Sequence, residues 1–79
     1  MARALFFGPV GEAAGGAERT IPNRCGTVRD ALDALAAEAP ALNQHRDRLR
    51  FAVNGAFVTP DHPLHSSDEL SILSPVSGG

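Results

Sequence analysis

The sequence TVRDALDALAAEAP, residues 27–40, predicts one amphipathic helix, and the rest of the fold is arranged around it. Thr27 is an N-cap, because its hydroxyl can accept a hydrogen bond from an unpaired backbone N–H of the first turn. Asp30 adds an acid to that turn, which suits the helix dipole. Pro40 ends the helix, because its ring is incompatible with a helix interior. Apolar residues recur at the spacing of one buried face: Val28, Ala31, Leu32, Leu35 and Ala36.

Two short strands are predicted before this helix. Residues 3–8 form an apolar run with two adjacent Phe, and Pro9 stops it. Residues 10–16 favour a single helical turn ended by glycines. Residues 17–22 then return as a second strand, so we expect an antiparallel hairpin.

Three more strands are predicted after the helix. Residues 49–53 and 56–59 flank Asn54-Gly55, the pair that suits a type I′ hairpin turn with positive φ at both central positions. Residues 69–73 form the last strand, which places Leu70 and Ile72 on one face and Ser71 and Leu73 on the other. Turns are expected at 60–63 and 66–68.

This order predicts an α+β fold, a mixed sheet of about five strands packed on one main helix. A chain of 79 residues forms one small domain with no room for a deep internal active site. We expect a domain over residues 1–74 and a flexible tail over residues 75–79. One helix covers only one face of the sheet, and an apolar patch on the other face would mark a partner surface.

Composition excludes several classes of function. The net charge is −2, and the densest basic patch, residues 46–50, is interrupted by Asp47, so we interpret it as solvated surface rather than a nucleic-acid site. No apolar run approaches 18 residues, so no membrane segment is predicted and a soluble cytoplasmic protein is expected. All seven basic residues are Arg, so the chain offers no lysine amine for linking copies of itself.

The remaining reactive side chains predict no catalytic or metal site. Cys25 is the only cysteine, and we expect a buried inert thiol, with a persulfide relay as the alternative. His62 and His65 lack further ligands nearby, and His45 is isolated, so no metal is predicted. Asp68 precedes Glu69 directly, and we expect it to organise a turn rather than share a paired-carboxylate site.

The sequence finishes with Gly78-Gly79. Glycine lacks a Cβ, so such a tail can enter a narrow channel and present its terminal carboxylate to an enzyme that approaches the backbone closely. The alternative is an ordinary frayed terminus.

Together these features resemble the small subunit of molybdopterin synthase, a sulfur carrier of the ubiquitin-like β-grasp group. The sequence departs from that family at Gly11, where members often carry Arg, and at Ser74-Pro75, where they often carry two prolines. The resemblance rests on Leu5-Phe6-Phe7, Glu12, Gly15, Thr27-Val28, Ala52-Val53-Asn54, Asp61-His62-Pro63-Leu64, Asp68-Glu69 and Pro75-Val76-Ser77-Gly78-Gly79.

The resemblance implies that chemistry takes place at the terminal carboxylate. An adenylyltransferase related to ubiquitin-activating enzymes would use ATP to adenylate Gly79, and a sulfur donor would displace AMP to leave a thiocarboxylate. The tail, with Gly78 next to the reacting group, would then enter the large catalytic subunit of the synthase. This chain would bind no cofactor, and the catalytic side chains would belong to its partners. The implied partner contacts are Phe7, Phe57, Leu73, Pro75, Val76 and Ser77.

Alternatives remain open at this point. Phe7, Phe57 and Leu73 are core residues in the competing interpretation. The same terminal chemistry would serve a sulfur carrier for thiamine synthesis or tRNA thiolation. A ubiquitin-like modifier would instead be attached to target lysines through Gly79, and a plain interaction module would not use its tail.

Overall fold

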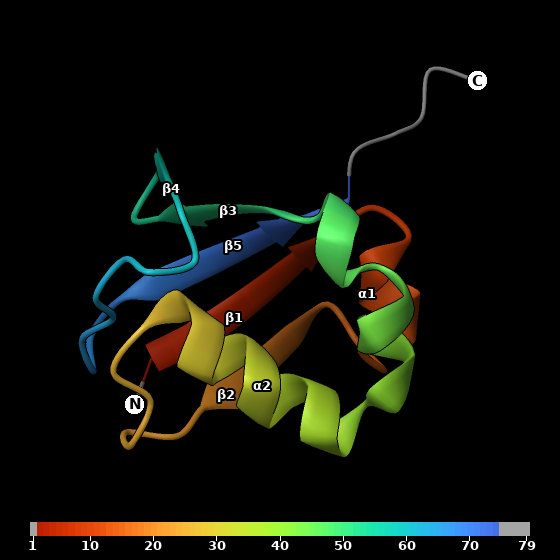
Figure 1. Cartoon of the computed structure of the whole chain (residues 1–79), viewed down its shortest axis with the longest axis horizontal. Helices are drawn as coiled ribbons and strands as arrows, with labels where there is room; N and C mark the ends of the chain where they lie inside the picture. The colour runs from red at the N-terminus through yellow and green to blue at the C-terminus, as the bar shows by residue number, and fades with distance from the viewer. Residues whose placement is uncertain (1, 75–79) are drawn as a thin grey trace.

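The sheet and its one main helix are the organising features of the structure, a computed structural model that describes residues 2–74, the side chains of residues 12 and 13 excepted (Figure 1). Five strands run in the order β2-β1-β5-β3-β4. This confirms the predicted mixed sheet with one main helix. The elements are β1 (Ala2–Phe7), α1 (Val10–Ala13), β2 (Glu18–Ile21), α2 (Val28–Glu38), η1 (Pro40–Gln44), η2 (Arg46–Arg48), β3 (Arg50–Val53), β4 (Ala56–Val58) and β5 (Glu69–Leu73).

The central pair of strands is parallel, and the other pairings are antiparallel. β1 runs parallel to β5, with Phe7 opposite Leu73 at the end of the register. β1 pairs antiparallel with β2, β3 with β5, and β3 with β4. Both predicted hairpins are therefore confirmed. The free edges of the sheet are β2 and β4.

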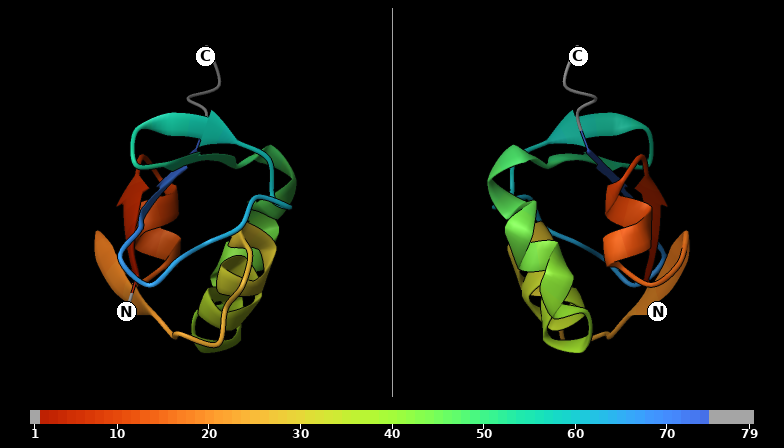
Figure 2. Two further views of the ribbon diagram at one scale, coloured as in Figure 1. Left: turned by 90° about the vertical axis from the view of Figure 1, so that its left-hand side faces the viewer. Right: turned by 90° about the vertical axis from the view of Figure 1, so that its right-hand side faces the viewer.

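Helix α2 forms as the sequence predicts. The Thr27 hydroxyl accepts a hydrogen bond from the Asp30 N–H at 3.1 Å, and the Asp30 carboxylate accepts one from the Gly26 N–H at 3.1 Å. The first bond satisfies a donor that a helix start leaves unpaired, and the second ties the residue before the cap to the first turn. The five residues predicted for the apolar face are all buried. Figure 2 shows the sheet curving around α2, which lies on one side of it.

The core fills the space between α2 and the inner sheet face. Phe6, Phe51, Leu70 and Ile72 are buried there against the helix. Leu42 of η1 is fully buried in the same cluster. The two 3₁₀ segments, η1 and η2, were not predicted, because short 3₁₀ turns carry no hydrophobic period in the sequence.

The Asn54-Gly55 turn has the predicted backbone, with φ of 50° at Asn54 and 88° at Gly55. The Asn54 side chain also joins this turn to β5. Its amide donates to the Asp68 carboxylate at 2.9 Å, and its oxygen accepts from the Glu69 N–H at 3.0 Å. The turn residue therefore fixes both the hairpin and the start of the last strand.

Candidate functional site: the outer sheet face and the tail root

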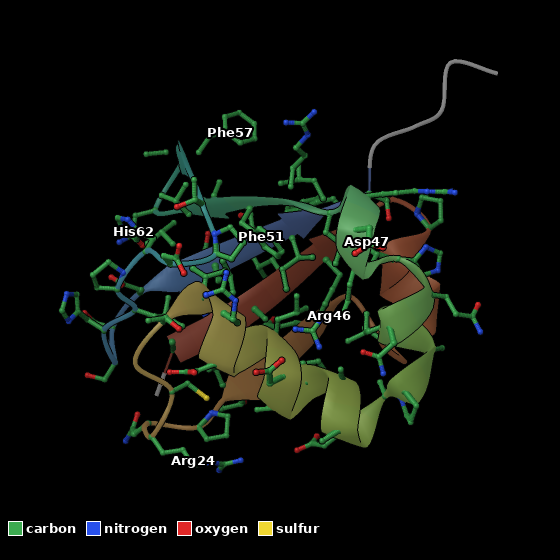
Figure 3. All side chains as sticks on the ribbon, in the orientation of Figure 1. Arg24, Arg46, Asp47, Phe51, Phe57 and His62 are labelled. Carbon is green, nitrogen blue, oxygen red and sulfur yellow. The ribbon has the colours of Figure 1, made fainter. Side chains whose placement is uncertain are left out.

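The face of the sheet opposite α2 carries the exposed aromatic residues. Phe7 is 49% exposed and Phe57 is 75% exposed, and they are the large exposed apolar side chains in the part of the chain that the structure describes. Leu73 is half-buried. Figure 3 shows Phe57 pointing away from the domain, whereas Phe51 points between sheet and helix. The interpretation of Phe7, Phe57 and Leu73 as ordinary core residues is therefore wrong.

Strand register arranges this surface in two rows. The first row is Phe7, Leu73 and Arg50, one residue from each of β1, β5 and β3. The second row is Leu5, Ser71, Ala52 and Phe57. Phe7 and Leu73 are direct neighbours, whereas Phe57 is two strands and one row away from Leu73, about 12 Å at ordinary strand spacing. We call these seven residues the outer face.

Charge differs between the two ends of the outer face. At one end Arg3 forms ion pairs with Glu18 at 3.1 Å and Glu69 at 2.8 Å. At the other end Arg50 is exposed, and it takes part in none of the ion pairs found among the side chains that the structure describes. The end of the outer face beside Phe7 and Leu73 therefore carries a cation.

A groove of about 560 Å³ adjoins this surface where β3 begins and β4 ends. Its lining includes Phe57, Val58 and Pro60 together with the arginines Arg46 and Arg50. Residues 46–50 were expected to form solvated surface, and Arg46 does not fit that expectation. It is half-buried and donates a hydrogen bond to Asp33 of α2 at 2.6 Å, because the η1–η2 turn brings it back over the helix.

The last described residue, Ser74, is held against the turn between β1 and α1. Its N–H donates to the Phe7 carbonyl at 3.2 Å, and its hydroxyl accepts from the Val10 N–H at 3.0 Å. Gly8 of that turn has φ of +81°, and a Cβ there would lie 3.3 Å from both the Ser74 Cβ and its carbonyl oxygen. We call this arrangement the tail root.

Sequence reasoning missed the tail root. The hydroxyl bond joins residues that are 64 positions apart, and no local pattern reports such a contact. The one available signal was Gly8-Pro9, which indicates a turn but not what packs against it. The other predicted site residues lie outside the described part of the chain: Pro75, Val76, Ser77, Gly78 and Gly79.

Cys25 is buried, as expected. Burial raises the pKa of its thiol; Arg24 opposes that change, and Asp30 and Asp33 reinforce it. A thiol with a raised pKa forms little thiolate, which is the nucleophilic form. The structure therefore favours an inert thiol over a persulfide relay.

Asp68 and His62 each help to form a turn, Asp68 through its side chain and His62 through its backbone. The Asp68 carboxylate accepts hydrogen bonds from the His65 N–H at 2.8 Å and from Asn54, which lower its pKa. This confirms the predicted turn role of Asp68. His62 shapes its turn through its backbone, since its N–H donates to Thr59 and its carbonyl accepts from Val28. Within residues 2–74 no three His, Cys, Asp or Glu side chains gather as a metal site requires.

The described residues therefore offer an exposed apolar surface. An exposed apolar patch beside a cation suits the surface of another protein. The chain leaves this patch at Ser74, and the residues that follow are PVSGG. No helix in the described part of the chain is long and apolar enough to cross a membrane.

Comparison with known proteins agrees with this architecture. The chain is 35% identical over 81 residues to the molybdopterin synthase sulfur carrier subunit of Escherichia coli, and the match covers 100% of both chains. Small archaeal modifier protein 1 from Haloferax volcanii has a similar structure, with a TM-score of 0.79, 30% identity and coverage of 99% of this chain and 98% of that one.

A third similar structure is part of a complex. That structure is the complex of subunits 1 and 2 of the molybdopterin-converting factor from Helicobacter pylori. The matching chain has a TM-score of 0.67 and 25% identity, and the match covers 99% of this chain and 97% of that one. These likenesses confirm the predicted ubiquitin-like β-grasp fold. The model of the ThiS family matches residues 4–79. The chain therefore belongs to the ThiS family.

Proposed function

We propose that this chain is the sulfur carrier subunit of a molybdopterin synthase. It carries sulfur as a thiocarboxylate on Gly79 and donates it for molybdopterin synthesis. Relatives with that name match the chain over nearly its whole length. The observation that carries the proposal is that the exposed Phe7 and the half-buried Leu73 adjoin Ser74, from which the chain continues to Gly78-Gly79.

The proposed chemistry begins with activation of the carboxylate. A carboxylate is a poor electrophile until one oxygen becomes part of a leaving group. An oxygen of the Gly79 carboxylate attacks the α-phosphorus of ATP, and pyrophosphate leaves. A donor that delivers sulfur at the oxidation level of hydrosulfide then attacks the acyl carbon, the C–O bond to phosphate breaks, and AMP leaves. The product is a thiocarboxylate.

The side chains that catalyse these steps belong to the partners in this proposal. ATP is bound by an adenylyltransferase related to ubiquitin-activating enzymes, and this chain binds no cofactor. Gly78 and Gly79 have no Cβ, which allows an enzyme to enclose the backbone closely. We propose the cytoplasm as the location, because the activation consumes ATP.

The outer face is the proposed contact with the large subunit. Phe7, Phe57 and Leu73 supply the apolar area, and Arg50 supplies a cation at its border. Aromatic and Arg side chains are frequent anchors of protein interfaces. In this proposal Pro75, Val76 and Ser77 contact the walls of the channel that leads to the active site of the large subunit.

Deletion of Gly79 tests the proposal. The purified chain is combined with the adenylyltransferase, the large subunit, ATP, sulfide and the pterin precursor, and molybdopterin is measured. We expect the deleted chain to give no product while its thermal unfolding matches that of the full chain. Molybdopterin formation by the deleted chain would overturn the proposed mechanism.

Complementation separates the possible sulfur pathways. In carrier-deficient cells the chain is expected to restore molybdenum-cofactor activity without restoring thiamine synthesis or tRNA thiolation. Restoration of either of the latter two, with no effect on the molybdenum cofactor, would assign the carrier to that pathway instead.

Protein modification is the second candidate, and the similarity to small archaeal modifier protein 1 favours it. The chain would then be joined through Gly79 to lysines of other proteins, one copy at each site, because it contains no Lys of its own. Higher-mass adducts on a denaturing blot that disappear when Gly79 is deleted would support this function.

A further inference from the structure

The tail root joins the docking surface directly to the tail. Phe7 belongs to the outer face through its side chain and to the tail root through its carbonyl, which accepts the Ser74 N–H at 3.2 Å. One hydrogen bond therefore connects the backbone of the exposed aromatic residue to the residue from which the tail continues.

The second bond of the tail root satisfies a buried donor. Val10 is fully buried, and its N–H belongs to the first turn of α1, where a helix supplies no internal acceptor. The Ser74 hydroxyl is the acceptor, at 3.0 Å. Because an unpaired buried N–H is unfavourable, this bond holds Ser74 in place.

The turn is shaped to admit Ser74. Gly8 has φ of +81°, a conformation that glycine adopts without strain, and it leaves room where a Cβ would press on Ser74 at 3.3 Å. The residue after Ser74 is a proline, which biases Ser74 itself toward extended backbone. Two hydrogen bonds, one close packing contact and this bias therefore act on the same residue.

We propose that Ser74 is a positioning residue that sets the origin and direction of the tail for acyl transfer at Gly79. This inference rests on the proposed function and extends it. Residues 75–79 can span about 17 Å at most. Because the carboxylate lies at the far end of this segment, a small rotation of the backbone at Ser74 displaces the carboxylate several times further than it displaces Ser74. A fixed root raises the effective concentration of the carboxylate in the partner's active site.

Loss of the tail root and loss of the outer face are expected to have different kinetic effects. Ser74→Ala removes the hydroxyl acceptor and leaves Phe7, Phe57 and Leu73 unchanged. We expect Kd for the large subunit to stay within about twofold of wild type, because the contact area is intact. We expect the single-turnover rate constant of sulfur transfer to fall about three- to tenfold, because the reacting group is less well placed. Ser74→Thr keeps a hydroxyl and should restore the rate.

A pair of glycine variants tests the packing contact independently. Gly8→Ala and Gly55→Ala impose similar strain, since φ is +81° at Gly8 and +88° at Gly55. Only at Gly8 does the new Cβ meet Ser74; at Gly55 nothing lies within 4 Å. Gly8→Ala is therefore expected to slow sulfur transfer and Gly55→Ala to leave it unchanged.

Amide hydrogen exchange measures the stability of the tail root in the isolated chain. In Ser74→Ala the Val10 N–H should exchange about tenfold faster than in wild type, and in Ser74→Thr at about the wild-type rate. Ser67→Ala removes an exposed hydroxyl elsewhere and should change neither exchange nor sulfur transfer.

The outcomes separate this inference from the proposed function. A slower transfer step with unchanged Kd and rescue by Ser74→Thr supports the positioning role. Equal transfer rates in wild type and Ser74→Ala, with faster Val10 exchange in the variant, would limit Ser74 to a structural role and overturn the inference alone. A wild-type chain that accepts no sulfur would overturn the proposed function, and the positioning role with it.

Discussion

Phe6 and Phe7 are adjacent in the sequence and have opposite environments. Phe6 is 5% exposed and packs in the core, whereas Phe7 is 49% exposed on the outer face. Strand alternation predicts that the two side chains point to opposite faces, but it does not say which face is covered by the helix. The assignment of Phe7, Phe57 and Leu73 to the outer face therefore needed the three-dimensional structure.

Phe51 and Phe57 provide a matched test of the two faces. Phe57→Asp should change the free energy of unfolding by less than about 1 kcal/mol, because the side chain is exposed. It should weaken binding to the large subunit at least about tenfold, because a charge replaces an apolar anchor. Phe51→Ala should instead lose about 3–5 kcal/mol of stability, because Phe51 is buried.

Urea denaturation and a binding titration measure both quantities. Unfolding of Phe57→Asp under native conditions would show that Phe57 contributes to the core and would contradict its assignment to the outer face. Binding as tight as in wild type would remove Phe57 from the partner surface.

Asp68 makes stability depend on pH. Hydrogen bonds from the His65 backbone and the Asn54 side chain lower its pKa from the ordinary 3.8, so the folded chain favours the carboxylate. This contribution is present above pH 3.8 and is lost as the pH falls through the lowered pKa of the folded state. Asp68→Asn should therefore be less stable than wild type at pH 7, with a smaller difference near pH 3.

Urea denaturation at the two pH values checks this prediction. Asp47→Asn is the control, because the Asp47 carboxylate accepts no hydrogen bond and forms no ion pair within residues 2–74. A deficit for Asp68→Asn that is equally large at both pH values would contradict the proposed link to ionisation.

Among the elements, α2 was the most predictable. Its cap, its apolar spacing and its terminating proline lie within 14 consecutive residues, 27–40, so local chemistry determines its bounds. The Asn54-Gly55 hairpin was predictable for the same reason. The η1 and η2 turns were not, because Leu42 is buried by packing against distant elements rather than by a periodic pattern.

The cap of α2 makes a measurable contribution. Thr27→Ala removes the acceptor for the Asp30 N–H and should lower the free energy of unfolding by about 1 kcal/mol. Thr59→Ala should have little effect, because the position is exposed and no hydrogen bond to its hydroxyl is found among the described residues. Thermal unfolding distinguishes the two, and equal stabilities would contradict the capping role.

In the molecule as a whole the main helix covers one face of the sheet and leaves the other face open, and this asymmetry links fold to function. A single helix leaves the outer face of the sheet available for a partner (Figure 2). The sequence was sufficient to predict that asymmetry, because it contains one long amphipathic period and five strand segments. The parallel register of β1 with β5, which brings Leu73 beside Phe7 and Ser74 beside the β1–α1 turn, depends on long-range packing.

The central claim is that Gly79 carries sulfur, and the intact mass of the chain purified from its own cells tests it most directly. Under conditions that preserve thiocarboxylates, we predict a population whose mass corresponds to one oxygen replaced by sulfur, located on Gly79 by fragmentation. Recovery of only the unmodified chain under the same conditions, or of a chain joined through Gly79 to other proteins, would contradict the account.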